Sequence, residues 1–514
     1  MSIRNLNRLC CLGLVLIANF SCQAPRQEKP PAENAFETGL RPLILFEDEP
    51  DPGWTLQERM DHYKVPGVGL AIIRNGRVWL AKGYGVKEAG TQDKVDADTV
   101  FSVGSVSKVV AAALTLKLTE TEKLDLDRDV NEYLTSWQVP QSNFPSQAAV
   151  TLRMLMSHTA GFNLHGFGDF LPDEPLPTAV QTLNGESPAK HEPLAFLFPP
   201  GERFKYSGGG VTVEQLVISD VMQLPFEEVA AAHLFAPLGL TRSTFANPLP
   251  AAHGDIAKAH NREGQLAATP RGWEAMPEMA ASGLWTSANE LGQLVVMLIQ
   301  SYQQEGQFLP RDLVVDMMTE VSPSWHGLGP RLDGVGRTRI FHHAGANNSY
   351  RAWMEGHLET GDGLVILTNG SNGTALMMEL RHAVADALGW ETHTPIRIKR
   401  LTLPAQAIAG FTGRFQPDES YPVSLRRYMV GGWFDAAMLI SSSNGQLAMN
   451  VEGRNTTYPL IPLTPNRFLV ANYHRGEVRL EIEFHRDIHA RTQAFTLHLN
   501  NLSSHYRRVK EGGP

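Results

Sequence analysis

A serine and a lysine stand three residues apart in the stretch "FSVGSVSK" at residues 101–108, just before the helix-forming run "VVAAALTLKL". On a helix, Ser105 and Lys108 would share one face. A serine hydroxyl is a weak nucleophile until a base removes its proton. A lysine serves as that base only when burial and a nearby positive charge lower its pKa from about 10.4. The pair therefore predicts either a nucleophile with its base or a serine that only caps the helix.

The same spacing occurs a second time, at Ser187 and Lys190 in "GESPAKHEP". The prolines of this stretch argue against a continuous helix, because proline lacks the N–H that a helix needs. Ser105 has the better context, with a long apolar run after it. We therefore expect the pair at Ser187 to be accidental.

Two further stretches carry residues that could assist a serine nucleophile. In "PPGERFKYSGGG", a loop leads to Tyr206, whose phenol could relay a proton if a cation lowered its pKa. The alternative is an ordinary half-buried aromatic residue. In "RIFHHAGANNSYRAWM", Gly345 would let a substrate backbone approach a strand closely, and the N–H of Ala346 could donate to an oxyanion. Taken alone, His342 and His343 would be ordinary strand histidines.

In this order, Ser-x-x-Lys, Tyr and His-x-Gly resemble the motifs of the serine β-lactamase and penicillin-binding-protein-like hydrolases of the class C type. That family includes class C β-lactamases, D,D-carboxypeptidases, D-aminopeptidases and related esterases. The resemblance covers roughly residues 45–390. It extends to the stretches "LRMLMSHTAGF", "FAPLGLTRSTF", "AASGLWTSANELGQLV" and "GLVILTNG".

The resemblance implies a role for each matching residue. Ser105 matches the acylated nucleophile, Lys108 its partner base and Tyr206 the tyrosine of the second motif. His343-Ala344-Gly345 matches the third motif, which is usually Lys-Thr-Gly in β-lactamases. The oxyanion hole would consist of the N–H groups of Ser105 and Ala346. Which group takes the serine proton stays open at this point.

The chain departs from the family pattern at two positions. Gly208 stands where the second motif usually ends in an asparagine that contacts the substrate amide and orients the lysine. His343 stands where β-lactamases carry lysine, although peptidase-like relatives often have histidine there. Both changes lower the expectation of efficient β-lactam hydrolysis. The chain has neither the Gly-x-Ser-x-Gly elbow of α/β-hydrolases nor the His-Glu-x-x-His of metalloproteases.

The elements around these motifs predict an α+β fold. Asn75-Gly76 between two apolar runs indicates a hairpin at residues 65–85. Strands near both ends of residues 45–392 and helices between them predict a β-lactamase/transpeptidase-like antiparallel sheet with a helical insert. After a linker at 393–405, short alternating runs at 406–514 predict a smaller all-β domain, barrel-like or a sandwich. We expect this domain to be structural or to shape the substrate cleft.

The N-terminus predicts export. Basic residues and a short apolar run fit a signal peptide at residues 1–21, too short for a membrane span, and "SCQA" resembles a lipoprotein cleavage site. Cys22 would then carry the lipid, with a flexible tether at 22–44 and a place at the membrane of a bacterial periplasm. The alternative is ordinary signal cleavage near Ala24. All three cysteines lie in this segment, so no thiol is expected in the body of the protein.

Composition bounds the function further. The chain has 514 residues, 42% hydrophobic residues and a net charge of -9, without a basic stripe, so we expect no nucleic-acid partner. We also expect no metal and no cofactor. The sequence thus predicts an exported serine hydrolase with an acyl-serine intermediate, acting on a small peptide, D-aminoacyl amide or ester. The alternative is a non-catalytic binding or sensor protein with the same fold, which Gly208 favours. The sequence leaves the oligomeric state open.

Overall fold

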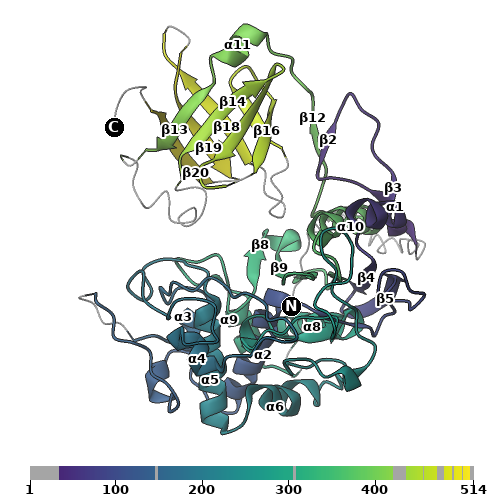
Figure 1. Cartoon of the computed structure of the whole chain (residues 1–514), viewed down its shortest axis with the longest axis vertical. Helices are drawn as coiled ribbons and strands as arrows, with labels where there is room; N and C mark the ends of the chain where they lie inside the picture. Colours follow the sequence, from purple (N-terminus) through teal and green to yellow (C-terminus); the bar gives the residue numbers. More distant parts are fainter. Residues whose placement is uncertain are drawn as a thin grey trace, which may run out of the picture.

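The computed structural model has two parts, a mixed α/β body and a β-barrel, and the strand β12 runs between them (Figure 1). It describes residues 34–144, 149–304, 308–418, 420, 436–454, 456–471, 480–488, 491–499 and 502–509. The predicted signal peptide and Cys22 lie outside the described residues, so these predictions stay untested.

A six-stranded antiparallel sheet forms the centre of the body. Its strand order is β5-β4-β11-β10-β9-β8, so strands from the two ends of the region lie side by side, as the sequence predicts. In register, Ala71 of β4 faces Val365 of β11, and Trp353 of β10 faces Ala344 of β9. The strands are β4 (Gly67–Arg74), β5 (Arg77–Gly85), β8 (Arg331–Asp333), β9 (Ile340–Ala346), β10 (Arg351–His357) and β11 (Gly363–Thr368).

The hairpin between β4 and β5 forms where the sequence indicates it. Asn75 and Gly76 have φ angles of 50° and 70°. Two consecutive positive φ angles match the twist of a two-residue hairpin, and asparagine and glycine tolerate them best. Strand β4 is buried along almost its whole length, because both faces of the sheet are covered. Ala71 and Ile73 belong to the core on one face, and Leu70 to the core on the other.

Helices cover both faces of this sheet. Helix α8 packs against β4, β5, β10 and β11, and α10 packs against β10, β11 and the short α1. The helical insert lies between β5 and β8 in the sequence and forms the remainder of the body. The helices are α1 (Leu56–Tyr63), α2 (Ser107–Glu120), α3 (Leu152–Met156), α4 (Ala179–Asn184), α5 (Gly208–Met222), α6 (Phe226–Ala230), α7 (Met279–Ser282), α8 (Ala288–Gln303), α9 (Arg311–Met317), α10 (Gly373–Leu388) and α11 (Ala405–Ala409).

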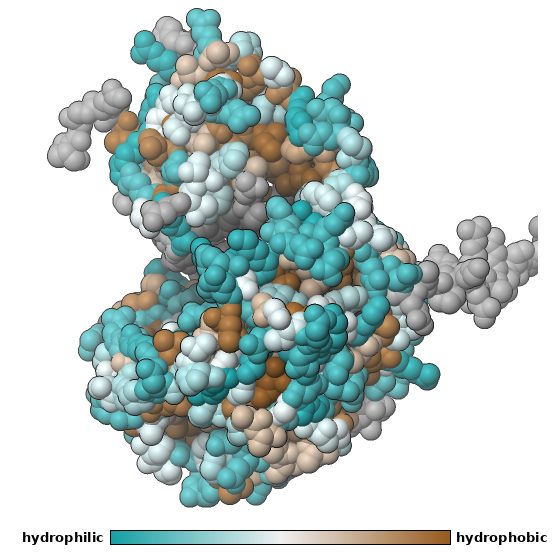
Figure 2. Space-filling view, turned by 45° about the vertical axis from the view of Figure 1, so that its right-hand side comes forward, coloured by the Kyte–Doolittle hydropathy of each residue, from teal (hydrophilic) through white to brown (hydrophobic). Residues whose placement is uncertain are grey.

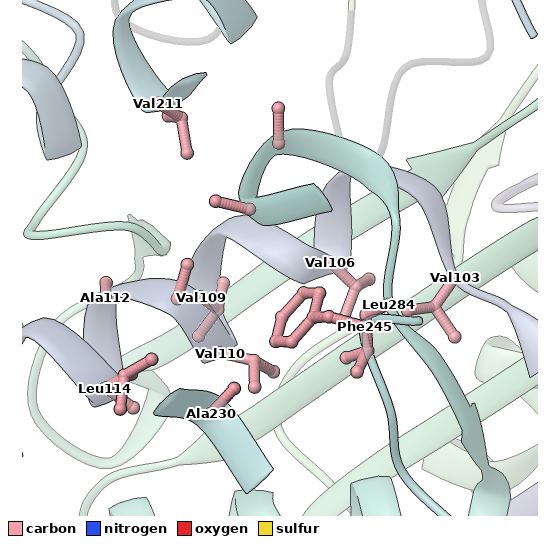
Figure 3. Close-up of a cluster of buried hydrophobic side chains, with 14 of the residues drawn as sticks. Val103, Val106, Val109, Val110, Ala112, Leu114, Val211, Ala230, Phe245 and Leu284 are labelled. Carbon is pink, nitrogen blue, oxygen red and sulfur yellow. The ribbon is translucent and has the colours of Figure 1, made fainter. Parts of the chain in front are cut away.

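Helix α2 lies inside the main hydrophobic core. Val106, Phe245 and Leu284, which come from three separate segments, gather around its start (Figure 3). Its residues are buried on nearly every side, so the helix lacks the polar face of a surface helix. The core therefore fixes the position and direction of the segment that carries Ser105 and Lys108.

The C-terminal part is a closed eight-stranded antiparallel barrel. Closure comes from the pairing of the first strand with the last, with Phe415 opposite Arg508. Aromatic side chains, among them Phe411, Phe484 and Phe495, fill the interior. The predicted all-β domain is confirmed as a barrel. Its strands are β13 (Gly413–Pro417), β14 (Met438–Ser443), β15 (Gln446–Val451), β16 (Thr457–Pro462), β17 (Arg467–Val470), β18 (Leu480–Arg486), β19 (Thr492–Leu499) and β20 (Leu502–Arg508).

Parts of the expected tether and linker are folded onto the body. Phe36 and Leu40 are buried against α10, and β1 (Thr38–Leu40) pairs with β3 (Trp54–Thr55). Strand β2 (Ile44–Phe46) runs parallel to β12 (Ile396–Ile398). The buried side chain of Arg41 holds these segments against the body. It forms an ion pair with Asp386 of α10 at 2.6 Å and donates to the His393 carbonyl at 3.0 Å. Such tertiary anchors leave no periodic signal in the sequence.

Hydrophilic and hydrophobic residues are mixed over the face that Figure 2 shows. Large exposed apolar side chains, such as Leu171, Leu224 and Leu439, come from segments far apart in the sequence. Within the described part of the chain, no helix has the length and apolar character that a membrane crossing requires.

Candidate active site

Ser105 and Lys108 meet at the start of α2. Ser105 lies in a single 3-10 turn, Gly104–Val106, and is partly exposed, whereas Lys108 is 3% exposed. The Lys108 Nζ donates to the Ser105 Oγ at 3.2 Å and to the Ala281 carbonyl at 2.6 Å. The hydroxyl is therefore within reach of a substrate, and the amine is held behind it.

The turn that carries Ser105 is fixed by its neighbours. The Ser107 hydroxyl donates to the Gly104 carbonyl at 2.6 Å and accepts from the Leu284 N–H at 2.9 Å. Gly104 has a φ of +51°, and a Cβ there would lie 2.7 Å from the Ala346 nitrogen. Glycine is needed at this position because the backbone of β9 approaches it so closely.

Strand β9 presents a backbone N–H to the nucleophile. The Asn347 N–H donates to the Tyr350 carbonyl across the β9–β10 turn. Inward and outward N–H groups alternate along an antiparallel strand, so the N–H of Ala346 points away from β10. Strand β8 pairs only with residues 340–342, and thus leaves this part of β9 uncovered. Ala346 is exposed and lies beside Gly104, where its N–H and that of Ser105 can hold an oxyanion.

Tyr206 lies beside the lysine and among histidines. The Lys108 Nζ is 5.1 Å from the centre of the Tyr206 ring. Ring centroids of four histidines lie around it, at 4.2 to 6.2 Å; these are His158, His165, His326 and His343. The Ser207 N–H donates to the His158 Nδ1 at 3.2 Å, which ties the tyrosine loop to the segment "MSHTAG". The arrangement brings the three predicted motifs together.

The buried histidines of this group are neutral. Burial lowers the pKa of His158, His326 and His343 well below its usual range, and the positive charge of Arg331 acts in the same direction. The His343 Nδ1 lies 2.7 Å from the Ala344 carbonyl, so Nδ1 carries the proton and Nε2 is an acceptor. The third motif therefore supplies a neutral imidazole where a lysine would supply a cation.

Gly208 begins α5, directly after the capping residue Ser207. Its N–H donates to the His165 carbonyl at 3.0 Å. A Cβ at this position would lie 3.0 Å from the Phe167 ring and 3.2 Å from the His165 carbonyl oxygen. The loop that contains these two residues takes up the space next to Gly208.

The second Ser-x-x-Lys pair lies in a turn rather than a helix. Ser187 is exposed, and Lys190 donates to Glu174 at 2.7 Å and to the Asp169 carbonyl at 2.9 Å. Lys190 thus holds a loop in place. This environment differs from that of Lys108, which is buried beside a hydroxyl.

Three residues near the site were not predicted as site residues from the sequence. The guanidinium carbon of Arg331 lies 5.8 Å from the Tyr206 ring centre. His158 and His326 lie against the same ring and are almost completely buried. A signal existed only for His158, which stands in the family-like stretch "LRMLMSHTAGF". Among the residues that the structure describes, no group of three or more His, Cys, Asp or Glu side chains is arranged to hold a metal ion.

A serine and a lysine at the start of a buried helix, beside the edge of an antiparallel sheet, define the class of serine hydrolases related to penicillin-binding proteins. The Beta-lactamase family model matches residues 55–389, and the chain belongs to that family. The chain is 30% identical over 248 residues to a beta-lactamase of Lysobacter lactamgenus, across 48% of this chain and 59% of that protein. The match thus spans about three fifths of that relative's length.

Solved structures share the fold. One is the octameric penicillin-binding protein homologue from Pyrococcus abyssi, with a TM-score of 0.56 and 20% identity, over 88% of this chain and 98% of that one. Another is EstCE1, a hydrolase with promiscuous acyltransferase activity, with a TM-score of 0.52 and 22% identity, over 64% and 96%. The first of these matches covers 88% of this chain, which is more than the share of the chain that precedes β13, the first barrel strand. The match therefore includes part of the barrel.

Proposed function

We propose that the protein is a serine hydrolase that works through a covalent acyl-serine intermediate. The Ser105 Oγ attacks the substrate carbonyl carbon, and its proton passes to Lys108 or Tyr206. The N–H groups of Ser105 and Ala346 stabilise the oxyanion. The proton then goes to the leaving group, and water releases the acyl group from the serine. The observation that carries this proposal is the 3.2 Å contact between the Ser105 Oγ and the buried Lys108 Nζ.

The substrate that fits best is a small ester, a D-aminoacyl amide or a peptide, rather than a β-lactam. His343 is buried and neutral, so it attracts an anionic substrate group less than a lysine would. Gly208 offers no side-chain amide. The polar groups of a β-lactam side chain would go unpaired there, at about 1–3 kcal/mol each. Steady-state kinetics on a chromogenic cephalosporin and an acetyl ester test this, and a higher kcat/KM for the cephalosporin would contradict it.

The nucleophile is tested by labelling with a fluorescent phosphonate. We expect Ser105→Ala to abolish labelling and to lower turnover by several orders of magnitude. Ser187→Ala is the matched control, because it removes the serine of the other Ser-x-x-Lys pair. If Ser187→Ala were the silent variant, the assignment would be reversed. If neither the wild type nor Ser187→Ala were labelled, the alternative of a binding or sensor protein that keeps the fold would be favoured.

We also propose that the protein is exported and anchored by a lipid on Cys22. Diacylation with a further N-acyl chain would hold it firmly, since stable anchoring needs more than one chain. The wild type should then partition into detergent, and Cys22→Ser should release it to the aqueous phase. A wild-type protein that stays aqueous and begins after Ala24 would contradict the anchor.

A further inference from the structure

The turn between β9 and β10 directly follows the oxyanion residue Ala346, and two carboxylates hold it from one side. Asp169 accepts from the Asn348 N–H at 2.7 Å, and Glu274 accepts from the Ser349 hydroxyl at 2.6 Å. Both acids and Ser349 are buried, so these hydrogen bonds are stronger than they would be in water. The place of the turn, and of the residue before it, therefore depends on these two acids.

Two backbone hydrogen bonds place the acids. Phe170 and Ala275 each donate to the carbonyl of the other, at 3.0 and 2.9 Å, so their two segments run antiparallel at this point. Asp169 and Glu274 are the residues just before these two. Because side chains alternate between the two faces of such a ladder, both carboxylates lie on the same face. The ladder thus presents both acids to one turn.

The segment that carries the nucleophile holds the same turn from another direction. The Asn347 side chain donates to the Ser102 hydroxyl at 2.5 Å. Ser102 is the last residue of β6 (Val100–Ser102) and lies three positions before Ser105. The turn is therefore fastened both to the approach of the nucleophile and to the two acids. A shift of the turn changes the distance between Ala346 and Ser105.

Burying two carboxyl groups beside one turn costs free energy. Burial raises the pKa of Asp169 to about 7, and the charge of Glu274 acts in the same direction. Burial also raises the pKa of Glu274. The positive charges of Arg351 and Lys190 lower the pKa of Asp169 and so offset only part of this cost. Buried ionisable groups add little to stability, and groups with perturbed pKa values gather at functional sites.

We propose that Asp169 and Glu274 are positioning residues that hold the Ala346 N–H where it stabilises the oxyanion. The oxyanion forms during the reaction and is absent from the bound ester. A displaced donor therefore slows the chemical steps and leaves the binding of the substrate almost unchanged. This inference rests on the proposed hydrolase function.

The test measures kcat and KM for the acetyl ester, and the rate and final extent of phosphonate labelling. We expect Asp169→Ala and Glu274→Ala each to lower kcat and the labelling rate on the order of tenfold, with KM within about twofold of the wild type. A displacement of about 1 Å in such a site costs on the order of 100-fold. The Ser371 hydroxyl, which donates to the Asn348 carbonyl at 2.8 Å, still holds the turn and limits the displacement.

The final extent of labelling separates positioning from a loss of structure. A folded variant with a misplaced oxyanion donor should be labelled slowly but to the same extent as the wild type, because its nucleophile is intact. Partial unfolding would lower the extent instead. Asp173→Ala is the matched control, since Asp173 is an exposed acid of the same loop, and it should leave both rates unchanged.

Conservative variants test the hydrogen bonds themselves. Asp169→Asn and Glu274→Gln keep an amide oxygen that can accept the same hydrogen bonds, so we expect kcat within about threefold of the wild type. Equal losses in Asp169→Ala and Asp169→Asn would overturn the role of the hydrogen bond.

Ser349→Ala removes the hydrogen bond of Glu274 from the side of the turn and changes few atoms, so it carries the test if an alanine variant of an acid does not fold. It should lower kcat about as much as Glu274→Ala, with KM unchanged. A wild-type kcat in both folded Ser349→Ala and folded Asp169→Ala would overturn the proposal. Turnover of the ester by Ser105→Ala would instead contradict the hydrolase function itself, so the two failures are distinct.

Discussion

Gly345→Ala tests whether the close approach of β9 to the nucleophile turn sets the rate. A Cβ at Gly345 would lie 1.8 Å from the Val103 carbonyl oxygen, whereas real Cβ atoms essentially never come closer than 3.0 Å. The two backbones must therefore separate by about 1.2 Å, the difference between these distances. This moves the Ala346 N–H away from Ser105, and a displacement of about 1 Å in such a site costs on the order of 100-fold in rate.

The assay is the rate of acetyl ester hydrolysis together with the rate of phosphonate labelling, with Tm measured on the same samples. We expect both rates to fall on the order of 100-fold, since both reactions use the same oxyanion donors. Gly53→Ala is the control, because nothing lies within 4 Å of its added Cβ. Rates within about threefold of the wild type in a folded Gly345→Ala would refute the reasoning.

Two other variants have defined outcomes. Burial raises the pKa of Glu278 to about 7. Between about pH 4 and pH 7, the folded protein therefore keeps a proton on this carboxyl group that the unfolded chain loses. Because the folded state binds more protons in this range, the free energy of unfolding falls as the pH rises from about 4 to 7. The free energy of unfolding is measured in urea at about pH 4 and about pH 8. In Glu278→Gln, the decrease between these two pH values should be about 3 kcal/mol smaller than in the wild type. The same decrease in both proteins would contradict the assignment. Arg331→Gln should raise KM about tenfold for a D-aminoacyl substrate with a free carboxylate and much less for a neutral ester, because the guanidinium beside Tyr206 is a positive charge near the site. Equal changes in both KM values would argue against this role.

Local patterns were sufficient for much of the fold. The Asn75-Gly76 hairpin was predictable because two residues alone decide that turn. The apolar runs of β4 and β11 identify strands that are buried on both faces. The barrel domain was predicted from the short alternating runs at 406–514, although prolines and arginines obscure the alternation in β13, β16 and β20. Parts of the expected tether and linker are folded, because Arg41 forms an ion pair with Asp386, which is distant in the sequence.

The sequence by itself determined the types and order of the chemically competent residues. Ser105, Lys108, Tyr206 and His343 could be named because their motifs are short and local. The sequence already favoured Ser105 over Ser187, and the tertiary structure adds that the lysine beside Ser105 is buried, since burial depends on the packing of α2 within the whole core. It also decided that His343 is neutral and that the loop of His165 fills the space beside Gly208. Burial, charge and close backbone approach come from residues distant in the chain, and no local pattern encodes them.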